Sequence, residues 1–142
     1  MYCALSDIVA RVPEETIIQL TDDAGLGAVD QTKVDQAISD SGEVIDGFLR
    51  GRYDLPLTTV PGLVLKIAVD LAVFNLYLRK MEIEMPKPVS DRYDNSVKLL
   101  MQIQKGLISL GIEATAAPAG GNYKTNKAST DRLFGKDTLD EY

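Results

Sequence analysis

The chain contains no histidine and no tryptophan, and its only cysteine is Cys3. A single cysteine cannot form a disulfide within the chain, so nothing indicates an oxidising compartment. Without histidine, the chain cannot supply an imidazole base to a serine, threonine or cysteine nucleophile. The Glu-x-x-His motifs of di-iron helical bundles are excluded for the same reason. We therefore expect no catalytic residues, no cofactor and no metal, and a protein that is not an enzyme.

Positive charge is also scarce, because 15 Lys and Arg residues face 21 Asp and Glu residues, for a net charge of −6. Nucleic-acid-binding domains usually present a basic face, so this balance argues against a subunit that grips DNA. A protein that surrounds DNA without binding it specifically stays compatible with this charge. The most hydrophobic segment, residues 63–78, is interrupted by Lys66, Asp70 and Asn75. A bilayer span needs about 20 largely uncharged apolar residues, so we expect no membrane span and a protein made in the cytoplasm.

The 142 residues, of which 45% are hydrophobic, are typical of one soluble domain. Apolar residues recur at helical spacing in five stretches separated by Pro, Gly and Asp. We predict an all-α fold, a small bundle of about five helices, two short and three longer, in residues 1–110. An extended C-terminal arm, residues 111–142, follows. The predicted N-caps are Ser6 or a nearby residue, Asp30 or Thr32, and Ser90, and Gly106 is the predicted left-handed C-terminal stop of the last helix.

The fourth predicted helix begins near Pro61 and is apolar on nearly all sides, which is typical of a central helix. A domain this small cannot readily cover such a helix completely. We therefore expect its side marked by Lys66, Asp70 and Tyr77, or the groove beside it, to meet another copy of the chain. A simpler interpretation of Lys66 and Asp70 is an ion pair within the helix, since they are one turn apart.

A short stiff corner joins the third and fourth predicted helices. Pro56 must end the preceding helix, and Pro61 suits the start of the next. Tyr53 and Pro56 are expected to pack the corner, and Arg50 and Arg52 to stabilise the helix C-terminus, with a phosphate contact as the weaker alternative. The predicted corner motif consists of Arg52, Tyr53, Leu55, Pro56 and Leu57.

Acidic residues gather at Asp22, Asp23 and Asp30. A calcium loop would need ligands at alternate positions, a central glycine and a closing glutamate, and this spacing does not provide them. We interpret the cluster as a solvated loop with a capping aspartate. In the same way, we interpret a second acidic group as the solvated face of a helix: Asp35, Asp40, Glu43 and Asp46.

The composition changes after Leu110. Residues 114–122 are small and lack core-forming side chains, which is typical of a linker. Apolar residues then return between positions 132 and 142, unlike in most disordered tails. We therefore predict a docking arm with Leu133, Phe134 and Leu139 as its contact residues.

Four motifs occur in an order that resembles one known family. They are Met1-Tyr2 before a short Asp-Ile helix, the Arg-Tyr-x-Leu-Pro-Leu corner at residues 52–57, Val60-Pro61 before an apolar helix, and Phe-x-x-Asp-Thr-Leu at residues 134–139. In this order the chain is similar to small tail-proximal proteins of Mu-type phages and prophages, the head–tail connector or adaptor proteins. The resemblance covers nearly the whole chain.

The resemblance implies a helical adaptor without catalytic residues that forms a homo-oligomeric ring at the portal exit. Its implied partners are further copies of itself, the portal protein and tail or head-completion proteins, with DNA passing through a channel. The implied location is the virion, after assembly in the bacterial cytoplasm. The alternatives are another virion assembly protein, for tail completion or associated with the capsid, a DNA-binding packaging subunit and, least favoured, an enzyme.

Overall fold

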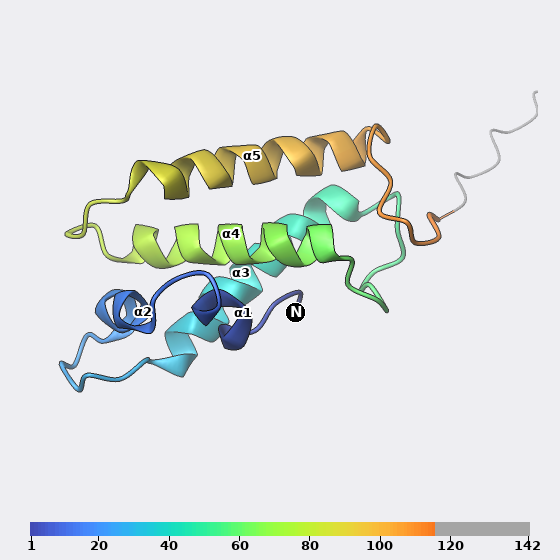
Figure 1. Cartoon of the computed structure of the whole chain (residues 1–142). Helices are drawn as coiled ribbons and strands as arrows, with labels where there is room; N and C mark the ends of the chain where they lie inside the picture. The colour runs from blue at the N-terminus through green and yellow to red at the C-terminus, as the bar shows by residue number, and fades with distance from the viewer. Residues whose placement is uncertain (116–142) are drawn as a thin grey trace, which may run out of the picture.

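The computed structural model describes residues 1–115, and within this range it contains five α-helices and no strand. Figure 1 shows two short helices at the N-terminus followed by three longer ones. This arrangement confirms the predicted all-α bundle. Leu133, Phe134 and Leu139 of the predicted docking arm lie outside the described residues. The helices are α1 (Leu5–Val9), α2 (Glu14–Thr21), α3 (Gln31–Leu49), α4 (Gly62–Arg79) and α5 (Lys87–Gln104).

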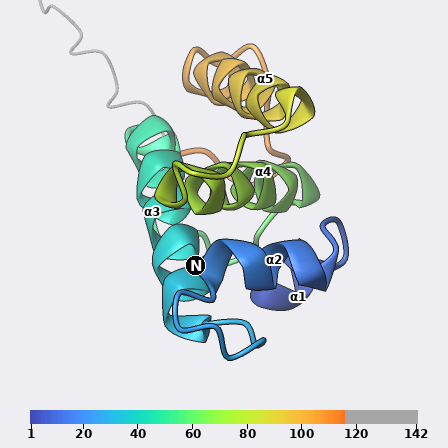
Figure 2. The ribbon, with the colours of Figure 1, turned by 90° about the vertical axis from the view of Figure 1, so that its left-hand side faces the viewer.

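Helix α4 is the central element, as its sequence predicted. It lies between α5 on one side and the α1–α2 pair on the other, with α3 packed across it (Figures 1 and 2). Ten of its residues are buried, and Leu78 is its only large apolar side chain that is exposed. The chain therefore covers α4 more completely than we expected from its size, because four helices share the task.

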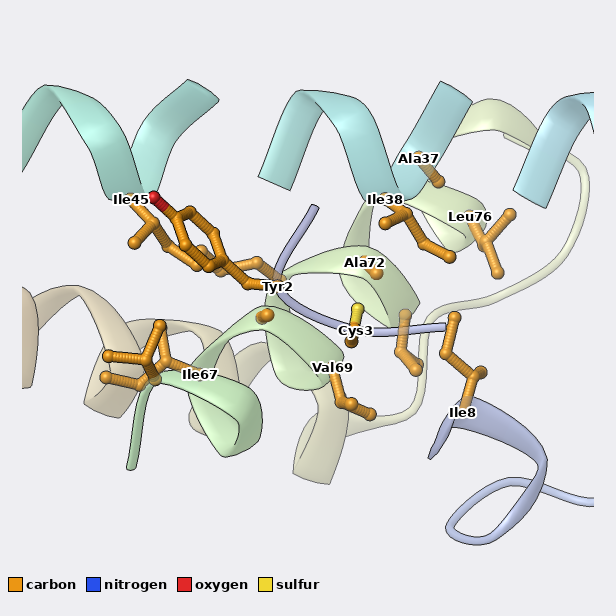
Figure 3. Close-up of a cluster of buried hydrophobic side chains, with 14 of the residues drawn as sticks. Tyr2, Cys3, Ile8, Ala37, Ile38, Ile45, Ile67, Val69, Ala72 and Leu76 are labelled. Atoms are coloured by element: carbon orange, nitrogen blue, oxygen red, sulfur yellow. The ribbon is translucent and has the colours of Figure 1, made fainter. Parts of the chain in front are cut away.

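The N-terminal residues contribute to the core before the first helix begins. Figure 3 shows Tyr2 and Cys3 between α3 and α4, and Ile8 of α1 joins the same buried cluster. The Tyr2 ring lies over Gly42 of α3, where an added Cβ would be 3.9 Å from the ring. The Tyr2 hydroxyl donates a hydrogen bond to Asp46. This strand-like entry segment ties α3 to the start of the chain.

Burial also determines the chemistry of Cys3. It raises the pKa of the thiol to about 11, and the nearby Asp7 carboxylate acts in the same direction. The thiolate is the reactive form of cysteine, so a thiol held protonated in the core is inert. Cys3 is therefore a packing residue, which agrees with its lack of any imidazole partner.

One predicted helix start is shifted and another is wrong. Helix α1 begins at Leu5 with Ala4, a residue near Ser6, at its N-cap, and Asp7 accepts the backbone N–H of Ala4 at 2.8 Å. Helix α5 begins at Lys87, three residues before Ser90, with Pro88 inside its first turn. Proline is tolerated there because the first N–H groups of a helix have no partner within the helix.

Helix α3 begins as predicted and ends earlier than predicted. Asp30 caps it by accepting the backbone N–H of Thr32 at 3.1 Å. Along its apolar face Val34, Ile38, Ile45 and Leu49 are buried, whereas Val44 is exposed. The helix ends at Leu49, so Arg52 lies in the corner that follows.

Candidate assembly interface

The corner after α3 reverses the chain within a few residues. Gly51 has a φ of +97°, a left-handed conformation that glycine adopts readily, and the backbone N–H groups of Arg52 and Tyr53 both bond to the carbonyl of Leu49. Tyr53 is buried, and Leu55 and Leu57 pack partly buried against the core. Pro56 is exposed, so the expectation that it packs the corner is wrong.

The corner also holds the segment that follows α5, residues 106–115, which we call the exit segment. The Tyr53 hydroxyl accepts the backbone N–H of Leu110 at 3.1 Å in a buried position. The carbonyl of Arg52 accepts the N–H of Thr115 at 2.7 Å, and the Thr115 hydroxyl lies 3.2 Å from Asp54. The chain is therefore fastened to the body as far as residue 115. The predicted domain division at residue 110 falls within this fastened stretch.

Arg52 fixes the beginning of the exit segment. Gly106, with a φ of +81°, ends α5 as predicted, and the N–H of Leu107 bonds to the carbonyl of Gln102 in a Schellman arrangement. The Arg52 guanidinium lies against Gly106 so closely that an added Cβ would collide with it. Its positive charge faces the negative C-terminal end of the α5 dipole. We expected Arg52 to play this part at the C-terminus of α3, the helix before the corner.

A groove beside α4 contains the three residues predicted to meet another copy. Lys66 and Asp70 form the predicted ion pair within the helix at 3.3 Å, and Ser96 of α5 contacts the same carboxylate oxygen at 3.4 Å. Asp70 and Tyr77 are buried, whereas Lys66 is exposed. Tyr77 lines one pocket and Lys66 an adjoining one, and the two pockets share Asp70; we call them together the α4 groove. Its contact with another copy stays a prediction.

The floor of the α4 groove is apolar and its rim is basic. A small cavity of about 50 Å³ opens between α4, the α1–α2 turn and the start of α5. Ligand and cofactor sites usually enclose about 300–1,000 Å³, so this cavity fits the end of one side chain only. The floor is formed by Val12, Val69, Val73 and Val89, and the rim carries Arg11, Lys66 and Arg92.

Two of the three rim cations were not identified from the sequence. Arg11 follows α1 and Arg92 belongs to α5, 81 positions further along the chain, and only the packing of both elements on α4 brings them to one groove. Arg11 donates a hydrogen bond to the Lys66 carbonyl at 3.5 Å. Neither arginine forms an ion pair with any of residues 1–115.

The acidic loop contains an ion-pair cluster in addition to the predicted cap. Asp23 lies within 2.6 Å of Lys33, 2.6 Å of Arg79 and 3.0 Å of Lys80. The hydrogen bonds from Lys33 and Lys80 lower the pKa of the Asp23 carboxyl to about 2. Asp22 accepts the backbone N–H groups of Leu26 and Gly27. The aspartates therefore close the α2–α3 loop and join it to the end of α4.

The described residues also lack two kinds of feature. No group of three or more acidic or cysteine side chains within residues 1–115 is arranged to hold a metal ion. None of the five helices combines the length and the apolar character that crossing a bilayer requires.

Comparison with known proteins places the chain among phage proteins. A family model described as Bacteriophage Mu, Gp36 matches residues 2–127. Gene product J of Escherichia phage Mu is 31% identical over 137 residues, which cover 95% of this chain and 94% of that protein. The Mu-like prophage FluMu protein gp36 of Haemophilus influenzae is 23% identical over 138 residues, 97% and 95% of the two chains.

These matches run along nearly the whole chain, so this is a bacteriophage protein of the Mu type. More specifically, the chain belongs to the bacteriophage Mu Gp36 family. The resemblance to Mu-type phage proteins is thereby confirmed.

Proposed function

We propose that this protein is a structural component of the virion, a head–tail connector that assembles into a ring at the portal exit and has no catalytic role. Support comes from its family, whose model matches residues 2–127, and from the phage Mu relative, which covers 95% of the chain. The observation that carries the proposal is the corner. Tyr53 and Arg52 fasten the exit segment, so everything after Thr115 starts from a fixed point on the helical body.

A fixed starting point suits a subunit that reaches a neighbour. The arm of one subunit can bind the body of the next subunit in a head-to-tail contact. Where the rotations between successive subunits add up to a full turn, this contact closes into a ring. Leu133, Phe134 and Leu139 are the proposed arm contacts, on a neighbouring copy or on the portal. Docking would bury these apolar side chains against the partner.

The charge of the chain suits a channel through which DNA passes. Proteins hold phosphates chiefly through Lys and Arg, and this chain has a net charge of −6. An acidic wall would repel the duplex and let it slide. The proposal therefore predicts weak binding of duplex DNA even at low salt, whereas tight binding that falls steeply with salt would indicate a packaging subunit.

Electron microscopy of the full-length protein mixed with the portal protein of the same phage tests the proposal. The expected result is a ring of this protein at the portal exit. If the protein binds tail tips or the capsid shell and leaves the portal bare, a tail-completion or capsid-associated role replaces the connector. Assembly takes place in the host cytoplasm in this proposal, so the same complex should be recovered from lysates of cells that produce both proteins.

A further inference from the structure

The α4 groove has the properties of a docking site for an acidic peptide. Arg11, Lys66 and Arg92 supply three positive charges around an opening whose only lining carboxylate belongs to Asp70. That carboxylate is already engaged by Lys66 and by the Ser96 hydroxyl. Since Arg11 and Arg92 form no ion pair within residues 1–115, their charges face the groove without a carboxylate partner from this part of the chain.

The cavity determines which kind of side chain fits. Valine side chains from α4 and its neighbours line a space of about 50 Å³, which admits an aliphatic tip but not a large ring. Tyr77 also lines this space, and Arg11 and Arg92 line both this space and the adjoining pocket that contains Lys66. The complementary occupant is therefore a leucine or a similar residue with acidic residues on both sides.

The chain itself contains such a segment. Residues 137–142 read Asp-Thr-Leu-Asp-Glu-Tyr, with Leu139 among three acidic residues and no basic one. The other apolar pair of the arm, Leu133-Phe134, is bordered by Arg132 and Lys136, which would face the basic rim with like charge. Charge complementarity therefore selects Leu139 and its neighbours.

We propose that residues 137–142 of one copy dock in the α4 groove of a neighbouring copy, with Leu139 in the valine-lined cavity and the acidic residues at the basic rim. The exit segment fastens the chain at Thr115, and the 21 residues between positions 115 and 137 can span up to about 70 Å when extended. This length reaches a neighbouring body. The choice of a neighbour over the same chain rests on the proposed ring, which needs a head-to-tail contact.

A binding measurement tests the groove and its occupant. The probe is a fluorescent peptide of residues 131–142, and the receptor is the full-length chain carrying Leu139→Lys, which disables its own segment. We expect saturable binding that weakens with added salt, because exposed charges are screened. Leu139→Ala in the peptide should reduce affinity about tenfold, since it removes most of one buried aliphatic side chain.

Matched substitutions in the receptor locate the site. Arg92→Glu should reduce peptide affinity about fivefold or more, because it reverses a rim charge. Lys98→Glu is the control, since it makes the same charge change at an exposed position of α5 that does not line the groove. No saturable binding, or an equal loss in both variants, would overturn the proposal.

Disulfide trapping separates docking on a neighbour from docking on the same chain. In full-length chains carrying Cys3→Ala, a Leu139→Cys copy is mixed with a Val89→Cys copy of different size, and Lys98→Cys replaces Val89→Cys in the control. We expect a mixed disulfide at Val89 and little at Lys98. If a chain carrying both Leu139→Cys and Val89→Cys forms only an intrachain disulfide at every concentration, the neighbour is the wrong occupant.

The same variants distinguish this inference from the connector proposal. If rings form at the portal exit but Leu139→Cys never forms a disulfide with Val89→Cys, the connector proposal is supported and the proposed docking in the groove is wrong. If the mixed disulfide forms but no ring appears with the portal, the groove assignment stands and the position in the virion is wrong.

Discussion

The hydroxyl of Tyr53 accepts the backbone N–H of Leu110 at 3.1 Å, across a separation of 57 residues. This bond joins the corner after α3 to the segment that leaves α5. Tyr53 is therefore more than a packing residue of the corner, because it fixes the place where the C-terminal part of the chain leaves the body.

Tyr53→Phe should remove this acceptor and leave a buried N–H without a partner. An unsatisfied buried donor costs about 1–3 kcal/mol, so urea unfolding should show a loss of stability in this range. The Leu110 amide should also exchange its hydrogen faster than in the unmodified chain. Tyr93→Phe is the control, because Tyr93 stacks on Phe74 through its ring. An unchanged exchange rate at Leu110 would contradict the assigned bond.

Gly106→Ala should destabilise the end of α5. A left-handed conformation costs a non-glycine residue about 1–2 kcal/mol, and the new methyl group would also push Arg52 from its place. Gly47→Ala is the matched control, since Gly47 lies within α3 with open space around it, and there alanine should add about 0.5–1 kcal/mol. Thermal unfolding should show a lower melting temperature for Gly106→Ala and a higher one for Gly47→Ala. Adding Arg52→Ala to the Gly106→Ala chain should restore only the part of the lost stability that comes from the collision between the new methyl group and Arg52.

Asp23 should make the fold sensitive to acid. The pKa of its carboxyl group is about 2 in the folded chain and near 4 in an unfolded one. Its contribution to folding stability is therefore fully present above pH 4 and is lost as the pH falls through about 2. Asp23→Asn should remove this part of the acid dependence of stability. Asp35→Asn is the control, because its carboxylate forms no ion pair within residues 1–115. Chemical denaturation between pH 2 and pH 6 compares the three chains.

Tyr2 should make the fold sensitive to alkali. Burial first, and then the hydrogen bond to Asp46, raise the pKa of its phenol to about 12, above the value near 10 of an unfolded chain. The neutral phenol therefore stabilises the fold fully below pH 10, and this contribution is lost as the pH rises through about 12. Ultraviolet titration should show the Tyr2 phenol ionising late, and this late component should be absent in Tyr2→Phe. A late tyrosine that persists in this variant would assign the shift to another residue.

Truncation after Gly121 should leave the helical body folded and impair assembly. The described helices and the fastened exit segment all precede this position, so circular dichroism should show helices that melt cooperatively. Sizing and electron microscopy with the portal protein should show fewer rings or none. Normal assembly of the truncated chain would contradict a role for the arm.

Local sequence was enough to predict the long helices. The repeat of apolar residues along α3 and the almost continuous apolar run of α4 each indicate one structure, and Asp30 and Gly106 mark ends that local hydrogen bonds decide. The intrahelical Lys66–Asp70 pair was predictable for the same reason, because four residues of helix bring the two side chains together. The family resemblance also followed from the order of short motifs along the chain.

Only the tertiary structure decided which distant residues meet. Ser90 was the predicted cap of the last helix, yet α5 begins at Lys87 and includes Pro88, because a first-turn residue needs no N–H donor. Tyr2 became a core residue only because α3 offers Gly42 and Asp46 to it. Arg11 and Arg92 share a groove because α1 and α5 both pack on α4. Helical periodicity describes one element at a time, whereas a surface assembled from several elements depends on how they pack, and no local pattern encodes that.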